Sequence, residues 1–436
     1  MAGETAVESA SGNIFSTYSL EQLRRRTSEK WRFYAPDVLP LWVAEMDVPL
    51  VASVREEIDR LIDLGDTGYD SAEDGRRYLE AYRGFAKRRW NADIDVKHGR
   101  TTVDVISGIR AVIVKTLGER PLRSATVAVD DSANDADEKA LYEGNVVVQT
   151  PIYPPFLHRL PQNYTLVKSP LNAEHHTDFE NLESAFARLE RHAPEQRPES
   201  GYNTVFVLCS PHNPTGTVFD ADELNRIVDL CKQYHVRLVV DEIHSPIVID
   251  TADSRSFVPI LSLPAASSAI VSVSASKGFS LPGFKAALLI PGADEEAQET
   301  VSALTQEDVH TGAHVASNVH AAAFERGDEW LDRMVAGLAE NEQLFRKQVA
   351  DELPKADVVL GRGTYLAFVD LGAYFAGTQW DGKASEALLE KARVAFNDGA
   401  TFGGAACGNY VRVNLATNPN IITEAVHRVA KFIQNL

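Results

Sequence analysis

Two kinds of hydrophobic pattern alternate through the first 300 residues. Continuous apolar runs bounded by turn residues, typical of buried strands, cover residues 146–148, 204–209, 237–240 and 269–273. Apolar residues at helical spacing fill the stretches 49–64, 76–89, 106–117 and 221–235. Buried strands that alternate with helices predict an α/β fold, in which a mainly parallel sheet carries helices on both faces.

After about residue 300 the pattern changes. A long helical region covers about 300–350, and short apolar runs and two further helical stretches follow it. The short runs lie at 358–360, 364–369 and 410–415, and the helical stretches lie near 384–396 and from 422 onward. This order predicts a second, smaller α+β domain.

The chain of 436 residues is too long for one simple core, so we divide it into parts. A disordered tip (1–13) precedes an N-terminal arm (14–48), which is expected to pack with the small domain. A large domain (49–300) and a small C-terminal domain (301–436) follow.

Composition and charge limit the partners of the chain. The formal net charge of −19 disfavours nucleic acid or an anionic membrane surface as a partner. Cys209, Cys231 and Cys407 are far apart and odd in number, which argues against a disulfide framework. Residues 1–13 lack the basic and apolar regions of a signal peptide, and no apolar run reaches membrane-spanning length. We expect a cytoplasmic protein that acts on a small molecule.

One stretch, residues 121–144, interrupts the α/β pattern. Its centre, 130–138, is acidic and almost free of apolar residues, so we expect a mobile surface insertion. The centre has some EF-hand character, but it lacks the glycine and terminal glutamate spacing of a calcium loop. His310 and His314 are four residues apart, yet no third metal ligand accompanies them. We therefore expect no metal site.

Polar side chains gather where the predicted strands end. One follows each of four strands: Tyr153, Asn213, Asp241 and Lys277. The carboxyl edge of an open α/β sheet is where such folds bind ligands. The hydroxyls of Ser274 and Ser276 precede Lys277, and Lys285 follows it. An amine that can form a Schiff base, beside hydroxyls and a cation that can hold a phosphate, is what pyridoxal phosphate requires.

Each candidate residue also has an ordinary structural interpretation. Asp241 can cap a helix, Asn213 can belong to a turn, and Arg412 can lie on a strand surface. Gly108 opens a helix whose free amides suit an anion, although many helices begin this way. The segment 41–49 is extended because of its flanking prolines, and it either packs its tryptophan on the core or lines a pocket. If each residue had only its ordinary role, their joint positions at the strand ends would be several unrelated coincidences. The cofactor site is therefore the favoured interpretation.

Five motifs carry a family resemblance: Leu-Trp-Val-Ala-Glu-Met-Asp at 41–47, Thr-Pro-Ile-Tyr-Pro-Pro-Phe at 150–156, Pro-His-Asn-Pro-Thr-Gly at 211–216, Asp-Glu-Ile-His at 241–244 and Ser-Lys at 276–277. On these motifs the sequence resembles fold-type I pyridoxal-phosphate enzymes of the class I/II aminotransferase superfamily. Within them it is most similar to the MalY/PatB branch of cystathionine β-lyases and cysteine-S-conjugate β-lyases. The resemblance runs from about residue 14 to the C-terminus.

The resemblance implies roles around the cofactor ring. Lys277 would be the Schiff-base lysine, Asp241 would bind the pyridinium nitrogen, and Tyr153 would stack on the ring face. Asn213 would donate to the ring phenolate oxygen. His244 lies where many aminotransferases carry a tyrosine that contacts the same oxygen.

The resemblance also implies contacts to phosphate and substrate. The phosphate would be held by Ser274, Ser276, Lys285 and the backbone of Gly108 and Ile109. Arg412 would grip the substrate α-carboxylate as a bidentate fork, in a pocket lined by Ala44 and Asn213. Tyr69 would reach the phosphate of the neighbouring subunit, which implies a homodimer with shared active sites.

The implied reaction is β-elimination from an L-cysteine S-conjugate or cystathionine, which gives thiol, pyruvate and ammonia. Lys277 would remove the Cα proton. An aminotransferase is the main alternative, although no second substrate-binding arginine is evident. A specialised-metabolism relative that decarboxylates or oxidatively deaminates a large conjugate also stays open, as does a regulatory protein that keeps the cofactor.

The sequence departs from the family pattern in three places. Glu45 replaces the usual aspartate, the insertion 121–144 is atypical, and residues 101–107 do not match the usual lead into the phosphate-binding glycine. These departures affect the identity of the substrate more than the binding of the cofactor.

Overall fold

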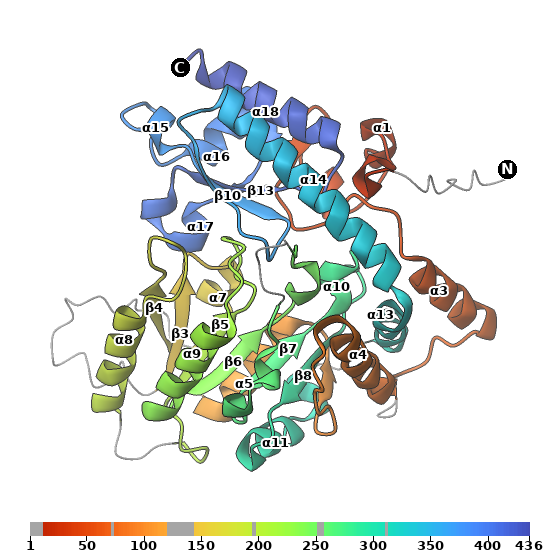
Figure 1. Cartoon of the computed structure of the whole chain (residues 1–436), viewed down its shortest axis with the longest axis vertical. Helices are drawn as coiled ribbons and strands as arrows, with labels where there is room; N and C mark the ends of the chain where they lie inside the picture. The colour runs from red at the N-terminus through yellow and green to blue at the C-terminus, as the bar shows by residue number, and fades with distance from the viewer. Residues whose placement is uncertain (1–11, 71–73, 120–143, 194–197, 251–256, 310–312) are drawn as a thin grey trace.

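The structure is a computed structural model that describes residues 12–70, 74–119, 144–193, 198–250, 257–309 and 313–436. Two sheets dominate it, one in the lower and one in the upper part of Figure 1. Most of the predicted tip, His310 and all of the predicted insertion except Gly144 lie outside the described residues. No helix in the described part of the chain is long and apolar enough to cross a membrane.

The lower sheet has seven strands in the order β2-β8-β7-β6-β5-β3-β4. They are β2 (Arg100–Thr102), β3 (Asn145–Thr150), β4 (Thr165–Pro170), β5 (Thr204–Cys209), β6 (Arg237–Asp241), β7 (Ile270–Val273) and β8 (Ala287–Pro291). Strands β4, β3, β5, β6 and β7 are parallel, whereas β8 is antiparallel to both β7 and β2. This mostly parallel sheet confirms the predicted fold class, although the pattern above does not include β2, β4 or β8.

Helices cover both faces of this sheet. They include α5 (Val105–Leu117), α8 (Phe179–Arg191), α9 (Ala221–Gln233) and α11 (Glu295–Ser302). Side chains alternate along a strand, so each strand contributes to two cores. Val205 and Val207 of β5 share one core with α5, whereas Phe206 and Leu208 share the other with α8 and α9. Burial on both faces explains why these strands are continuous apolar runs in the sequence.

The predicted helical region 300–350 contains the end of α11 and, among the described residues, three further helices. They are α12 (Gln306–Val309), α13 (His314–Arg326) and α14 (Asp328–Glu352). Helix α13 packs against α3 (Ala52–Leu64) and α4 (Asp74–Trp90), where Phe324 stacks on Tyr78. Part of the stretch assigned to the small domain therefore lies against helices assigned to the large one, and the division into domains stays a prediction.

The upper sheet is antiparallel, in the order β12-β13-β10-β9. Its strands are β9 (Asp357–Val359), β10 (Leu366–Asp370), β12 (Asn397–Asp398) and β13 (Tyr410–Asn414). Around it lie α14, α15 (Gly372–Phe375), α16 (Ala384–Ala387), α17 (Ala400–Gly403) and α18 (Pro419–Ile433) (Figure 1). The helix predicted near 384–396 ends earlier, at Ala392, because Arg393 adopts a left-handed φ of 57° and begins the turn into β11 (Val394–Ala395).

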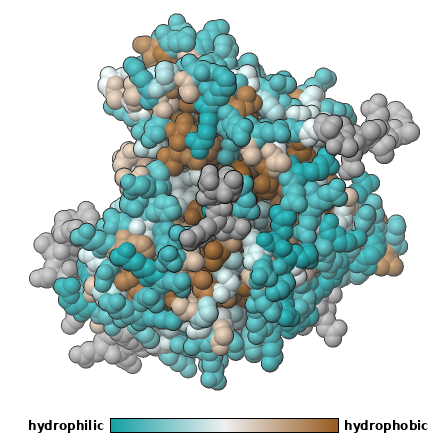
Figure 2. All heavy atoms as spheres, viewed as in Figure 1, coloured by the Kyte–Doolittle hydropathy of each residue, from teal (hydrophilic) through white to brown (hydrophobic). Residues whose placement is uncertain are grey.

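The N-terminal arm joins the two parts of the molecule. Its strand β1 (Leu39–Pro40) pairs with β11, and α1 (Leu20–Leu23) and α2 (Glu29–Arg32) precede it. The buried carboxylate of Asp47 accepts hydrogen bonds from Lys30 Nζ at 2.6 Å, Trp31 Nε1 at 2.9 Å and Thr417 Oγ1 at 2.7 Å. Figure 2 shows polar residues over most of one face, with apolar ones gathered at the waist between the two parts.

Candidate active site

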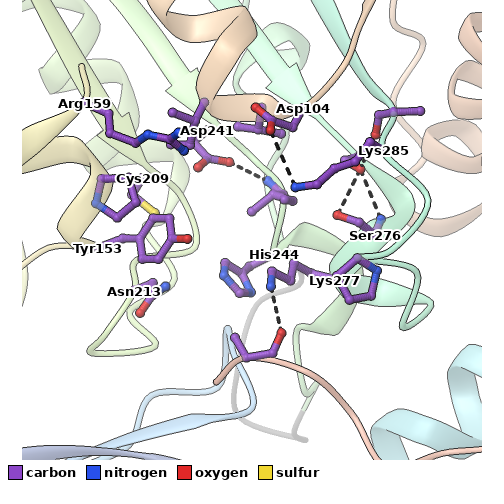
Figure 3. Close-up of a pocket in the computed structure, with 18 of the residues that line it drawn as sticks. Asp104, Tyr153, Arg159, Cys209, Asn213, Asp241, His244, Ser276, Lys277 and Lys285 are labelled. Carbon is purple, nitrogen blue, oxygen red and sulfur yellow. Dashed lines mark hydrogen bonds and ion pairs between the residues drawn. The ribbon is translucent and has the colours of Figure 1, made fainter. Parts of the chain in front are cut away.

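One cavity lies at the carboxyl ends of the parallel strands, beneath the upper sheet. It is lined from β5, β6, the turn after β7, α5, α7 (Pro154–His158) and the arm. Among its lining residues are Ala44, Asp104, Ile106, Tyr153, Arg159, Cys209, Asn213, Asp241, His244, Ser274, Ser276, Lys277 and Lys285 (Figure 3). The structure therefore brings together most of the site residues expected from the sequence.

The turn after β7 positions the lysine. Ser274 caps the short helix α10 (Ala275–Gly278), because its hydroxyl accepts from the amide of Ser276 at 3.1 Å and donates to the carbonyl of Ala286 at 2.8 Å. A Cβ atom on Gly278 would lie 2.7 Å from Pro246, so only glycine fits there. Lys277 consequently projects from α10 into the cavity.

The amine of Lys277 is buried and donates a hydrogen bond to the carbonyl oxygen of Ala44 at 2.8 Å. Burial, with the nearby charges of Arg412 and Lys285, lowers the pKa of Lys277 to about 8. A substantial fraction of the amine is therefore neutral near physiological pH, as a nucleophile or a base requires.

Asp241 ends β6 on the floor of the cavity. Its carboxylate accepts a hydrogen bond from the amide of Ile243 at 3.0 Å, and burial raises the pKa of Asp241 to about 7. A buried carboxylate of this kind favours a proton or a cationic partner. It therefore suits the protonated nitrogen of an aromatic ring.

Arg412 of β13 lies beside the cavity rather than among its lining residues, and it is only 2% exposed. Its guanidinium donates to Asn213 Oδ1 at 3.3 Å and to the carbonyl oxygen of Trp42 at 3.1 Å. Among the described residues it has no carboxylate partner, and its Nε has no hydrogen-bond acceptor. Burial lowers the pKa of Arg412 to about 10. This donor fork suits a carboxylate ligand.

The other end of the cavity is built to hold an anion. Lys285 lies 3.6 Å from Asp104, and Ser276 lies beside them (Figure 3). Asp104 caps α5 by accepting from the amide of Ser107 at 2.8 Å, so the amides of Val105 and Ile106 lie at the open helix start.

The prediction that the backbone of Gly108 and Ile109 holds the phosphate is wrong in register. The amide of Gly108 already donates to the carbonyl of Asp104 at 3.0 Å, and neither residue lines the cavity. A Cβ on Gly108 would lie 2.8 Å from Thr102, so this glycine serves helix–strand packing instead. The capping pattern of an aspartate three residues before Ser107 is the sequence signal that places the helix start one turn earlier.

Two predicted residues are less simply placed. Tyr69 is fully exposed and does not line this cavity, so its expected role toward a second subunit stays a prediction. His244 is buried with no hydrogen-bond partner at Nδ1, and burial lowers the pKa of His244 well below its usual value. A neutral imidazole therefore faces the cavity. His314 is buried beside Asp66, at 3.2 Å, and no cluster of metal-ligating side chains occurs in the described part of the chain.

Sequence reasoning missed three residues. The hydroxyl of Tyr365, which precedes β10, donates to the Ala44 carbonyl at 3.0 Å, the same oxygen that accepts from Lys277. Cys209 and Arg159 line the cavity. No local pattern identifies them, because their proximity to the site arises only when distant segments meet.

The residues present fit pyridoxal phosphate. A buried amine, a buried carboxyl and the aromatic ring of Tyr153 surround one space. The helix start at Val105, with Ser274, Ser276 and Lys285, offers donors for a phosphate at one end. The unsatisfied Nε of Arg412, whose guanidinium bonds the cavity residue Asn213, offers a donor for a carboxylate.

Comparisons with known proteins agree with this reading. The model of the family "Aminotransferase class I and II" matches residues 139–429. A Mycobacterium tuberculosis protein named "Putative cystathionine beta-lyase" is 37% identical and covers 96% of this chain and 98% of its own. The cystathionine beta-lyase of Corynebacterium glutamicum is 29% identical, over 95% of this chain and 99% of its own.

A solved structure, the PLP-bound C-S lyase from Staphylococcus hominis, has the same fold. It superposes with a TM-score of 0.79 at 22% identity and covers 96% of this chain and 98% of its own. The family resemblance expected from the sequence is thus confirmed. The chain belongs to the class I and II aminotransferase family, with the pyridoxal-phosphate-dependent fold of its C-S lyases.

Proposed function

We propose that this protein is a pyridoxal-phosphate-dependent C–S β-lyase that cleaves an L-cysteine S-conjugate or cystathionine to thiol, pyruvate and ammonia. The observation that carries the proposal is the pair Lys277 and Asp241 on one cavity wall, with the buried Arg412 hydrogen-bonded to Asn213 of the same cavity. The names of the Mycobacterium and Corynebacterium relatives support elimination over other outcomes.

When bound, the cofactor supplies an electron sink for the carbanion at Cα. Arg412 binds the substrate carboxylate and orients the Cα–H bond toward Lys277. The neutral amine of Lys277 then removes the Cα proton at its Nζ. With the cofactor bound, Asp241 would hold its ring nitrogen protonated and Tyr153 would contact the ring. The thiolate leaves from Cβ and takes up a proton, and water hydrolyses the remaining 2-aminoacrylate to pyruvate and ammonia.

Transamination is the second candidate, because it uses the same base and the same carboxylate grip. The observation that favours it is Arg159, a second arginine on the cavity wall. A dicarboxylic amino acid would suit two arginines. Processing of a large conjugate in specialised metabolism, with decarboxylation or oxidation, needs the same first steps and gives different products.

We also propose that the active unit is a cytoplasmic homodimer. The fully exposed Tyr69, and the exposed apolar residues Ile62 and Leu64 near it, are suited to contact a second copy. All three cysteines are free thiols, which suits a reducing compartment.

The test is product analysis on the cofactor-loaded protein. A panel of L-cysteine S-conjugates, from small alkyl to bulky groups, and cystathionine would be followed by mass spectrometry with the cofactor spectrum. Pyruvate, ammonia and free thiol, absent with Lys277→Ala, would support the β-lyase. A 2-oxo acid that retains the sulfur would establish the transaminase instead, and carbon dioxide with an aldehyde would establish the decarboxylating outcome.

A further inference from the structure

Arg159 stands directly after α7, six residues beyond Tyr153, and lines the same cavity. Its side chain is exposed. No acceptor or carboxylate partner for its guanidinium occurs among the described residues, so the charge is available to a ligand. Figure 3 shows Arg159 on the Tyr153 side of the cavity, away from Lys277.

The backbone that carries Arg159 is held rigidly. Its amide donates to the carbonyl of Pro155 at 2.8 Å. The guanidinium of Arg110 donates to the carbonyl of Arg159 at 3.2 Å, and also to those of Leu160 at 3.0 Å and Gln162 at 3.1 Å. A cation on a fixed platform can select for ligand geometry better than one on a loose loop.

The remaining walls of the cavity already have partners for the cofactor and the common part of an amino acid. Arg412 suits the α-carboxylate, Lys277 meets the reacting carbon, and the end near Lys285 suits the phosphate. Among the described lining residues, Arg159 is the cation to which none of these roles is assigned.

The net negative charge of the chain gives the cation of Arg159 a role in attracting a ligand. The chain has a net charge of −19, which repels anionic ligands as they approach. Lys285 is paired with Asp104, and Arg412 is buried deep in the site. Arg159 is therefore the exposed cation without a carboxylate partner on the described cavity wall, and it could offset this repulsion for an anionic side chain.

We propose that Arg159 is a second anion-binding group of the active site, and that the favoured substrates carry a carboxylate on the sulfur-linked side chain. The proposal rests on the proposed function, because it assigns the substrate class of the same site. Cysteine conjugates with an S-carboxyalkyl group belong to this class.

The test compares two substrates that differ only in charge, S-carboxymethyl-L-cysteine and S-carbamoylmethyl-L-cysteine. With the cofactor-loaded wild type, the acid should have the higher kcat/KM. In Arg159→Gln, KM for the acid should rise about three- to tenfold, with less than about twofold change for the amide. Arg159→Lys should recover part of the preference, and raised salt should weaken it.

A matched control is Arg191→Gln, which removes an equal charge from an exposed arginine at the end of α8, outside the cavity. It should leave the acid-to-amide ratio unchanged. An unchanged ratio in Arg159→Gln would overturn the proposal. So would a loss of cofactor affinity in Arg159→Gln without a change in the ratio, because Arg159 would then serve the cofactor.

Failure of the proposed function gives a different result. Binding of the two compounds to cofactor-loaded Lys277→Ala, with and without Arg159→Gln, can be measured by calorimetry without turnover. If the wild type releases no thiol, yet Arg159→Gln weakens binding of the acid alone, the anion site stands and the β-lyase assignment falls. If thiol is released but the two compounds bind with equal affinity, the proposed anion site is contradicted and the β-lyase assignment stands.

Discussion

The amine of Lys277 and the carbonyl of Ala44 are joined by a 2.8 Å hydrogen bond across 233 residues of sequence. The bond connects the turn after β7, in the lower sheet, to the N-terminal arm. Because the arm also contacts β13, the reactive amine is positioned by three distant segments at once. The properties of Lys277 therefore depend on the whole assembly.

The lowered pKa of Lys277 predicts how cofactor capture depends on pH. Only the neutral amine attacks an aldehyde, so the rate at which apo-protein captures pyridoxal phosphate should rise as pH increases through about 8. Well below that pKa, the rise should be about tenfold per pH unit. Stopped-flow absorbance checks this, with Lys277→Ala as the variant that cannot capture the cofactor covalently. A rate that is flat between pH 6 and pH 9 would contradict the assignment.

Asp241→Asn should lower the activity while it raises the stability of the apo-protein. We expect activity to fall by at least about 100-fold, because the amide cannot hold a protonated ring nitrogen by charge. The folded-state pKa of Asp241, about 7, lies above its ordinary value of 3.8, so the carboxyl destabilises the apo-protein as pH rises from about 4 to 7.

The same Asp241→Asn change should therefore raise the melting temperature of the apo-protein at pH 8, and much less at pH 5. Scanning calorimetry at both values measures this. An equal shift of the melting temperature at the two pH values would show that burial of the ionised Asp241 carboxylate does not destabilise the apo-protein.

Arg412→Lys tests the carboxylate grip. A lysine keeps the charge but cannot form the two parallel hydrogen bonds of a guanidinium, so KM for the amino-acid substrate should rise at least about tenfold. Cofactor affinity should stay within about twofold, since Arg412 is not among the residues that line the cavity around Lys285. Steady-state kinetics and cofactor titration measure the two effects. Equal losses in both would point to a general collapse of the site.

Asp47→Ala tests the anchor of the N-terminal arm. It leaves the buried ammonium of Lys30 without its 2.6 Å partner, which should lower the free energy of unfolding by about 3–5 kcal/mol. Thr417→Val removes only one of the hydrogen bonds to this carboxylate and should cost about 1 kcal/mol. Urea unfolding of the two variants gives the comparison, and equal losses would show that the ion pair is not the anchor.

The central strands were predictable because they are buried on both faces, which leaves an apolar run with polar residues at its end. The same logic located Asp241 and Lys277. Strands β2 and β8 were missed because their place depends on antiparallel pairing with distant partners, which leaves little local trace. The predicted phosphate-binding amides at Gly108 lie one helical turn too late in the sequence. A glycine indicates backbone flexibility, but it does not show which amides of the helix are free. Tyr365 and Arg159 needed the tertiary structure.

The ties between β13 and the arm also bear on the order in which the protein is made. Trp42 and Val43 present carbonyl oxygens to Arg412 and Asn414, which follow them by 370 and 371 residues along the chain. During synthesis the lower sheet can begin to fold early, since domains generally fold as their residues emerge. These contacts cannot form until β13 has left the ribosome. A nascent chain that already carries Lys277 but not yet Arg412 is thus unable to grip a substrate, and competence for chemistry waits for β13 to emerge.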